Sequence, residues 1–258
     1  MPIHPTAIID SNTTIAADAE IGPYCVIGPD VRIGARTRLM SHVVFEGRLT
    51  IGEDNVFFPF CSCGVAPQDK KYHGERSETI IGNSNHIREF VTIHRGTEGG
   101  GMRTVVGDQN LLMAYVHVAH DVIIHNHTIL ANGVTFAGHV TVEDYANIGG
   151  LSAIHQFCRI GKHAIVGSRS VIKQNVLPFS QTATDHEAKV YGANRVGLQR
   201  SGFAAEAVEP LQNAFRLLSN SGLNTSQALV RIEQEVPLTV EVKELLDFIR
   251  SSERGFVK

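Results

Sequence analysis

The sequence predicts a mainly β protein: a parallel β-helix built from hexapeptide repeats, followed by a small C-terminal α-helical domain. Apolar residues recur every six positions through most of the chain, often with glycine next in sequence. A six-residue period fits neither the helical period of about 3.6 residues nor a long alternation of two, but short strands separated by regular corners produce it. Hexapeptide repeats are typical of parallel β-helices. The repeat ends at Ile172, and amphipathic helical patterns follow it.

The first run of the repeat begins near the start of the chain. Its positions are Ile3, Ile9, Ile15, Ile21, Ile27, Ile33, Leu39, Phe45, Ile51, Phe57 and Cys63. Three hexapeptides form one triangular coil, so residues separated by three hexapeptides should stack in columns with the strand spacing of about 4.8 Å. The apolar residues then line the interior of the prism.

Two interruptions break the repeat, at about residues 65–80 and about residues 94–105. The second contains the run Gly99-Gly100-Gly101. The repeat returns between them at Ile81, Ile87 and Ile93, and after them at Val106, Leu112, Val118, Ile124, Leu130, Phe136, Val142, Ile148, Ile154, Ile160, Val166 and Ile172. Insertions in a solenoid form loops, which either carry binding groups or are plain excursions of the chain.

Helical patterns fill the C-terminal part of the chain. Residues 203–218 carry apolar side chains at helical spacing, and Pro210 should start or kink a segment there. Asn224 can cap a helix that runs to about Glu235, and residues 240–249 supply another.

These patterns divide the chain into two domains. Residues 1–192 form the β-helix, and residues 193–258 form the helical domain. The open end of a β-helix exposes unpaired backbone groups, so we expect the helices to cover that end.

Composition excludes several classes of protein. The 23 Lys and Arg against 26 Asp and Glu give a net charge of −3, without the basic surplus of a nucleic-acid-binding protein. The start, MPIHPTAIID, is not a charged leader, and no apolar stretch approaches the ~18 residues of a transmembrane segment. We therefore expect a cytoplasmic protein. The four cysteines, Cys25, Cys61, Cys63 and Cys158, form no CxxC pair and are expected to be reduced core thiols.

One column of the predicted prism carries a candidate catalytic site. His120, Gly138 and Gln156 follow one another at intervals of three hexapeptides, so they should stack on successive coils, with Asp121 and His139 in the next column. The glycine between two polar side chains leaves a notch where an acyl carbonyl could approach a backbone N–H. A neutral imidazole can deprotonate a hydroxyl near neutral pH. Seven of the thirteen histidines lie in this stretch: His117, His120, His125, His127, His139, His155 and His163.

Zinc is an alternative use of these histidines. His117 and His120, together with His125 and His127, have spacings that metal ligands can have. A catalytic zinc site needs three converging ligands and an open position, and it would leave Gly138 without a role. We therefore expect no metal.

Several segments together resemble one family of enzymes. They are QDKKYHGE (68–75), IREFVTIHRGT (87–97), DQNLLMAYVHVAHD (108–121), FAGHV (136–140), IHQFCRIG (154–161) and RSGF (200–203). Across essentially its whole length the chain is similar to the UDP-N-acetylglucosamine O-acyltransferases that begin lipid A biosynthesis. The resemblance implies a left-handed β-helix and a homotrimer with clefts between subunits. It also implies transfer of a 3-hydroxyacyl chain from the phosphopantetheine arm of acyl carrier protein to the glucosamine 3-hydroxyl, with no other cofactor.

The resemblance also implies roles for individual residues. His120 matches the general base, Asp121 the group that orients it, and the N–H of Gly138 the oxyanion donor. Residues that match substrate contacts are Gln68, Asp69, Lys71, His94, His117, His139, His155, Gln156, Asn194 and Arg200. The chain departs from the family at Val196 and Ser201, where a glutamate and a second arginine are common, so its nucleotide contacts should differ.

Two positions match residues that set acyl-chain length in the family. They are Ser168 and His186, which are separated by three hexapeptides and should therefore share a column. A glycine at the first position leaves the longest channel, so a serine favours a medium to long chain. Cations that could meet the acidic surface of acyl carrier protein, or that are merely solvated, are Lys162, Arg169, Lys173 and Lys189.

Three alternatives stay open at this stage. The same site could acylate the amine of a 2,3-diamino UDP-sugar, because the same base and cleft would serve a nitrogen nucleophile. A zinc-dependent protein like the hexapeptide-repeat carbonic anhydrases would use the histidines as ligands. A purely structural solenoid would leave the His120, Gly138 and Gln156 column unexplained.

Overall fold

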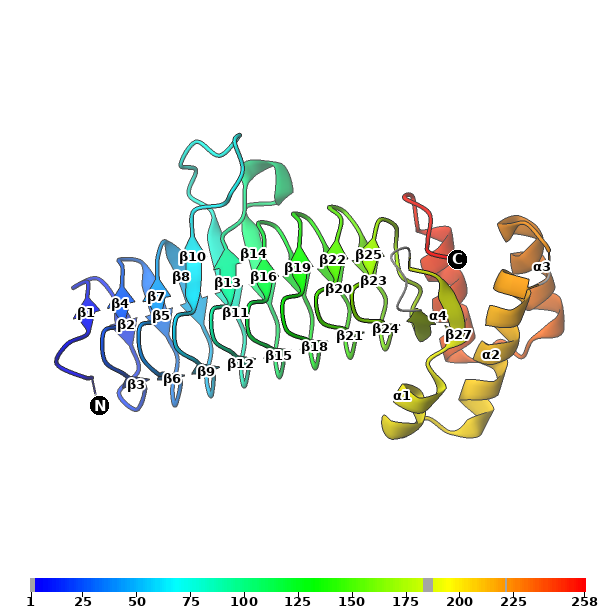
Figure 1. Ribbon diagram of the computed structural model, residues 1–258, viewed down its shortest axis with the longest axis horizontal. Helices are drawn as coiled ribbons and strands as arrows, with labels where there is room; N and C mark the ends of the chain where they lie inside the picture. Colours follow the sequence, from blue (N-terminus) through cyan, green and yellow to red (C-terminus); the bar gives the residue numbers. More distant parts are fainter. Residues whose placement is uncertain (1–2, 183–187, 221) are drawn as a thin grey trace.

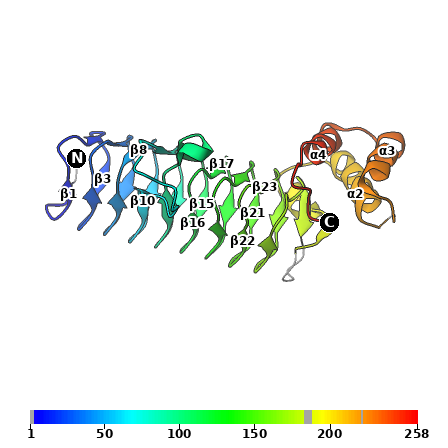
Figure 2. The same cartoon turned by 90° about the horizontal axis from the view of Figure 1, so that it is seen from above.

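Short parallel strands wind into a long three-sided prism, with helices standing at its C-terminal end (Figures 1 and 2). This computed structural model describes residues 3–182, 188–220 and 222–258. Among these residues no helix is long and apolar enough to cross a lipid bilayer. The parallel β-helix that the six-residue period predicts is confirmed.

Each side of the prism is one sheet. The first contains β1 (Ile8–Ile9), β4 (Val26–Ile27), β7 (Val44–Phe45), β10 (Ser62–Val65), β13 (Thr92–His94), β16 (His117–Val118), β19 (Thr135–Phe136), β22 (Ala153–Ile154) and β25 (Val171–Ile172). The second contains β2 (Thr14–Ile15), β5 (Val31–Ile33), β8 (Arg48–Ile51), β11 (Glu78–Ile81), β14 (Arg103–Val106), β17 (Ile123–Ile124), β20 (Thr141–Val142) and β23 (Arg159–Ile160). The third contains β3 (Glu20–Ile21), β6 (Arg38–Leu39), β9 (Val56–Phe57), β12 (His86–Ile87), β15 (Leu111–Leu112), β18 (Ile129–Leu130), β21 (Asn147–Ile148), β24 (Ile165–Val166), β26 (Ser180–Thr182) and β27 (Val190–Ala193).

The core of the prism consists of the inward-facing apolar residues predicted from the repeat, which stack in columns on its three sheets. Val118 pairs with Phe136, and Phe136 with Ile154, each three hexapeptides further along the chain. Because successive residues of a strand face opposite sides, the second residue of most strands points inward and is buried, while its neighbour faces out. The four cysteines are buried free thiols, as expected.

Both interruptions of the repeat leave the prism at the same corner. Ile51 pairs with Ile81, and Ile81 pairs with Val106, so each of these two coils is longer than three hexapeptides. The extra residues run from the first sheet to the second, between β10 and β11 and between β13 and β14 (Figure 1). The two loops touch: the N–H of Glu98, in the short 3-10 helix η1 (Glu98–Gly100), donates to the Glu75 carboxylate at 3.4 Å.

The helices follow the strands. They are α1 (Arg195–Arg200), α2 (Ala205–Asn220), α3 (Thr225–Glu235) and α4 (Val240–Arg250). Asn224 caps α3 in a capping box with Gln227, as predicted. Pro210 lies inside α2, so the expectation that it starts a segment is wrong. The sequence pattern did not reveal α1, because so short a helix with one buried side chain, Leu198, has no visible period.

Aromatic and charged contacts fasten the helical end to the prism. His163 stacks on Tyr145 with 4.6 Å between ring centroids, and the ring of Phe203 meets it edge-on at 5.0 Å. The Arg159 guanidinium lies 3.6 Å from the ring centroid of Phe248 on α4. Burial, with the nearby Lys162 charge, lowers the pKa of His163 to about 4.

This low pKa makes stability depend on pH. In the unfolded chain a histidine binds its proton near pH 6.5, so as pH falls from about 6.5 toward 4 only the unfolded state gains one, and the free energy of unfolding drops. Replacing His163 by Phe keeps the stack but cannot titrate. We expect His163→Phe to remove up to roughly 3 kcal/mol of the stability loss between pH 7 and pH 4.

Thermal unfolding at several pH values measures this loss. The control is His127→Phe, because His127 stacks on the opposite face of Tyr145 and belongs to the same row of rings. If both variants lose as much stability as the original chain when the pH falls from 7 to 4, the buried His163 does not cause this loss.

Candidate active site

The candidate site lies at the corner from which the two loops leave. His120 and Asp121 follow β16, and His139 follows β19 one coil further on. Asp121 and His139 adopt left-handed backbone conformations, with φ of 60° and 61°. Aspartate visits this region more readily than most residues.

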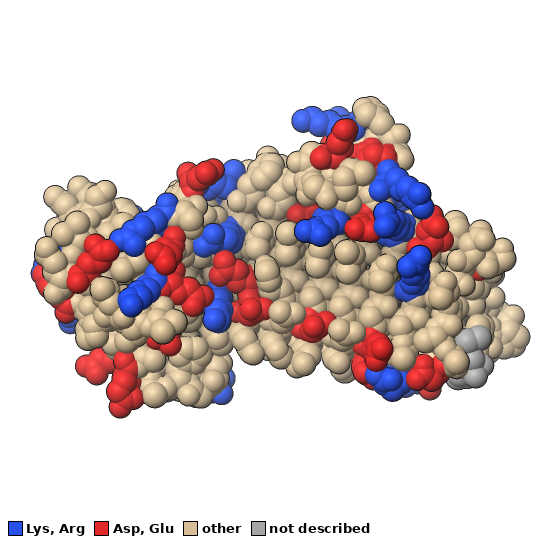
Figure 3. Space-filling model, turned by 180° about the vertical axis from the view of Figure 1, so that it is seen from behind, with Lys and Arg blue, Asp and Glu red and all other residues tan. Residues whose placement is uncertain are grey.

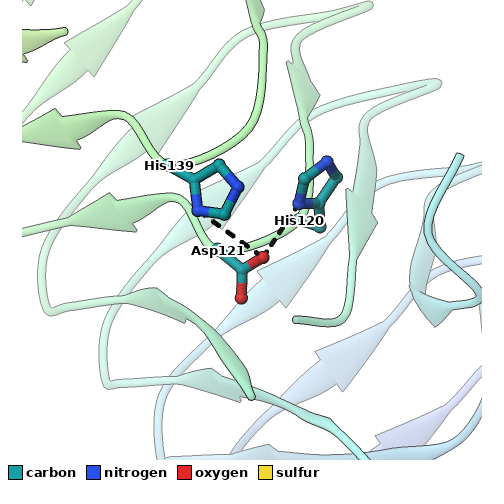
Figure 4. A group of neighbouring side chains, drawn as sticks. All are labelled: His120, Asp121 and His139. Atoms are coloured by element: carbon teal, nitrogen blue, oxygen red, sulfur yellow. Dashed lines mark hydrogen bonds and ion pairs between the residues drawn. The ribbon is translucent and has the colours of Figure 1, made fainter. Parts of the chain in front are cut away.

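His120 and Asp121 form a hydrogen-bonded pair. Nδ1 of His120 lies 2.8 Å from Oδ2 of Asp121, and Nδ1 of His139 lies 3.8 Å from the same oxygen (Figure 4). With Nδ1–H of His120 donated to the carboxylate, its Nε2 carries the free lone pair. The predicted pairing of these two residues is therefore present with the geometry of an oriented base.

The Asp121 side chain is almost completely enclosed, with 1% of it exposed. Oδ1 accepts the N–H of Thr97 at 2.9 Å, and Oδ2 accepts the Thr97 hydroxyl at 2.5 Å. The hydroxyl of Thr104 accepts the backbone N–H of Asp121 at 2.8 Å. Buried carboxylates need such partners to stay ionised. Neither threonine is among the predicted site residues, because both lie where the repeat is interrupted.

Gly138 leaves room for the His120 ring. A Cβ at Gly138 would lie 2.4 Å from Cε1 and 2.8 Å from Nε2 of His120, closer than side chains approach each other. Among the described residues, the N–H of Gly138 has no hydrogen-bond acceptor. A free N–H beside a free imidazole nitrogen is the notch that the column arithmetic predicts.

A groove of about 780 Å³ runs along the outer face of the first sheet past this notch. Seven predicted site residues line it: Gln68, His94, His117, His120, Gly138, His155 and Gln156. Burial lowers the pKa of His94 to about 4, and burial also lowers the pKa values of His117 and His139. Lys173 lines the groove as well, whereas the sequence suggested it only as a contact for a carrier protein.

Other predicted residues lie outside this groove. Asp69 and Lys71 are in the first loop, where the N–H of Lys71 donates to the Asp69 carboxylate at 3.0 Å. Asn194 is 7% exposed; it caps α1 and donates to the backbone oxygen of His163 at 3.0 Å. Arg200 is exposed at the end of α1. Asn194 thus has a structural task besides the predicted substrate contact.

The spacing of three hexapeptides does not extend to the last coil. Ile165 pairs with Gln181, so this coil is shorter than the three hexapeptides from which the column of Ser168 and His186 is predicted. After this coil the chain reverses, and β27 pairs antiparallel with β26. His186 lies outside the described residues.

Charges on the prism and helices are mixed. One face carries acidic and basic side chains interspersed (Figure 3). Lys162, one of the cations considered for a carrier-protein surface, lies 3.7 Å from the Glu244 carboxylate. It is therefore partly neutralised within the chain.

The alternative zinc site suggested by the sequence used His117, His120, His125 and His127, and the structure brings a different group together. In the described part of the chain, the group with ligand atoms close enough for one ion is His120, Asp121 and His139, within 4.8 Å. His125 and His127 are not part of it. Two of its three ligand atoms are already joined by the hydrogen bond between His120 and Asp121.

Fold and site together define a hexapeptide-repeat acyltransferase. The family model "Bacterial transferase hexapeptide (six repeats)" matches residues 3–35 and 103–138. A second model, "Udp N-acetylglucosamine O-acyltransferase; Domain 2", matches residues 175–257.

Similar sequences and solved structures place the chain within this class of acyltransferases. The chain is 48% identical over 256 residues, 99% of both chains, to a protein of Thermodesulfovibrio yellowstonii named as an acyl-acyl-carrier-protein UDP-N-acetylglucosamine O-acyltransferase. The structure of LpxA from Acinetobacter baumannii matches with a TM-score of 0.95 and 44% identity over 99% of both chains. The structure of LpxA from Bacteroides fragilis matches with a TM-score of 0.96 and 39% identity, over 99% of this chain and 100% of that one. The chain belongs to the UDP-N-acetylglucosamine O-acyltransferase family, and the left-handed form of the β-helix is confirmed.

The notch yields a prediction about Gly138. A methyl group there must displace the His120 imidazole, so Gly138→Ala should lower acyltransferase activity at least roughly 100-fold, the scale of losing an oriented base. The control is Gly28→Ala, where the added Cβ meets nothing closer than 3.4 Å. Steady-state rates and thermal unfolding of both variants test this. Full activity in Gly138→Ala would show that the ring does not need its present position.

Proposed function

We propose that the protein transfers a 3-hydroxyacyl chain from acyl carrier protein to the 3-hydroxyl of UDP-N-acetylglucosamine, the first step of lipid A biosynthesis. The observation that carries the proposal is the His120–Asp121 pair beside the free N–H of Gly138. A base and an oxyanion donor on one side of a groove are what ester formation from a thioester needs. The names of the relatives support the donor and the acceptor.

In the proposed reaction His120 Nε2 takes the proton of the sugar hydroxyl as its oxygen attacks the thioester carbonyl carbon. The carbonyl electron pair moves to oxygen, where the Gly138 N–H stabilises it, an effect of roughly 3 kcal/mol for one such donor. The C–S bond then breaks, and the departing thiolate takes the proton back from His120. Asp121 keeps its charge throughout and stabilises the imidazolium between the two proton transfers.

The other histidines around the groove suit contacts rather than proton transfer. Their lowered pKa values keep His94 and His117 neutral at neutral pH. His117 Nδ1 already lies 2.7 Å from the hydroxyl of Thr92. We propose that they line the path of the acyl chain and sugar, while the loop residues Asp69 and Lys71 meet the sugar nucleotide.

We also propose that the enzyme is a homotrimer with grooves shared between subunits. The groove is open on the outer face of one sheet, and a second wall would enclose the acyl chain. Exposed apolar rings at the edge of the same sheet support a contact there: Phe60 stacks on Phe90, and Phe90 on Tyr115, at centroid distances of 5.0 and 4.9 Å.

A single-turnover assay tests the reaction. We mix excess enzyme with 3-hydroxyacyl carrier proteins of several chain lengths and UDP-N-acetylglucosamine, and we compare the original chain with His120→Ala. The proposal predicts transfer that falls by roughly 100-fold or more without the imidazole. Gln156→Ala, which alters the groove but keeps the base, should lose less.

The choice of acceptor is tested in the same assay. A 2,3-diamino UDP-sugar replaces UDP-N-acetylglucosamine, and mass spectrometry separates ester from amide product. Faster transfer to the diamino sugar would contradict the proposed acceptor. Unchanged transfer in His120→Ala would contradict the proposed base.

A further inference from the structure

The second loop closes directly over the Asp121 carboxylate. Thr97, the residue before η1, donates both its N–H and its hydroxyl to the two oxygens of that carboxylate. His120 Nδ1 shares Oδ2 with the Thr97 hydroxyl. The carboxylate that orients the base is therefore held from the opposite side by one residue of an inserted loop.

Gly100 completes this cover. A Cβ built at Gly100 would lie 1.9 Å from Cγ of Asp121, so the loop backbone rests against the carboxylate itself. At Gly99, the preceding residue, an added Cβ would meet nothing within 4 Å. The loop thus packs tightly against Asp121 at Gly100, whereas Gly99 before it is open to solvent.

Three hydrogen bonds hold this buried carboxylate in one orientation. Without the Thr97 hydroxyl, Oδ2 would accept only from His120, and only the Thr97 N–H on Oδ1 would still hold the carboxylate from the loop. A hydrogen bond to a charged group contributes roughly 1.5–3 kcal/mol, an order of magnitude or more in an equilibrium constant. Losing it would alter both the direction of the imidazole and how strongly the carboxylate holds the imidazolium.

We propose that Thr97 is a positioning residue of this enzyme: its hydroxyl locks the Asp121 carboxylate in the rotamer that aims His120 at the groove. Thr97 does not reach substrate and acts only through Asp121. This inference rests on the proposed function of the His120–Asp121 pair. It assigns to the second loop a part in catalysis beyond contact with substrate.

Other titratable groups face the same pair. His139 lies 3.8 Å from Asp121, and His94 on β13 and His117 on β16 interact electrostatically with His120. Asp69 in the first loop acts electrostatically on His139. None of these groups contacts the Thr97 hydroxyl, so a change at that hydroxyl should leave them in place.

Two substitutions of Thr97 separate its hydroxyl from its volume. Thr97→Val keeps the shape and the N–H but loses the hydroxyl, whereas Thr97→Ser keeps the hydroxyl. We expect Thr97→Val to lower kcat roughly 10-fold or more with KM changed less than about twofold, and Thr97→Ser to recover most of kcat. The acidic midpoint of the kcat/KM profile should move to higher pH in Thr97→Val, because a less neutralised carboxylate holds the imidazolium more firmly. Equal rates and midpoints in Thr97→Val and the original chain, or equal losses in both variants, would overturn the proposal.

The two glycines provide a matched pair that leaves Thr97 in place. Gly100→Ala should push the loop off Asp121 and reproduce the kcat loss of Thr97→Val, whereas Gly99→Ala should behave like the original chain. Thermal unfolding of both variants shows whether either change merely destabilises the loop. Identical kcat values for the two alanine variants would contradict a fitted cover.

A measurement without substrate separates this inference from the proposed function. NMR titration of nitrogen-15-labelled histidines follows His120 directly, with His120→Ala used to assign its signal. A higher titration midpoint for His120 in Thr97→Val supports the lock even if no acyl transfer is found. An unchanged midpoint overturns the lock even if transfer to UDP-N-acetylglucosamine proceeds as proposed.

Discussion

The rest of the structure depends on the parallel hydrogen-bond register between successive coils. Each coil donates its N–H groups to the carbonyls of the next, as from Ile123 to Val140 and from Thr135 to Ser152. These bonds keep equivalent residues of successive coils directly above one another, within the strand spacing of roughly 4.8 Å. A side chain on one coil is thereby brought against the backbone of the next without any long-range folding event. The contact between the His120 ring and Gly138 is one instance of this.

Polar residues inside the corners maintain the register where the strands are very short. The amide of Asn85 donates to Asn55 Oδ1 at 3.0 Å, and its own oxygen accepts the N–H of Asn110 at 2.9 Å. Buried amides must find such partners, since an unsatisfied one costs about 1–3 kcal/mol. A slip of the register would leave several of them unpaired. The ladder therefore opposes slippage in the coils where the two insertions change the residue count.

How much of this could be predicted from the sequence follows from the same register. The column of His120, Gly138 and Gln156 was predictable because stacking at three hexapeptides holds without interruption from β14 to β25. The same spacing does not extend to β26, where Ile165 pairs with Gln181, so arithmetic alone does not fix which residues lie beside Ser168. Thr97 could not be predicted, because the path of an insertion is set by its own contacts with Glu75 and Asp121 and not by a period. The role of Asn194 as a cap was hidden for a similar reason, since α1 has no pattern of its own.

The electrostatics distinguish one histidine among several as the proposed base. His94, His117, His120 and His139 gather around the groove, and burial works against a proton on three of them. His120 alone of these four has a ring nitrogen within hydrogen-bond distance of a carboxylate. That carboxylate accepts hydrogen bonds from the inserted loop, whose Thr97 supplies donors in place of water. The periodic prism therefore supplies the position of the proposed base, and the non-periodic loop supplies the donors that hold the carboxylate beside it.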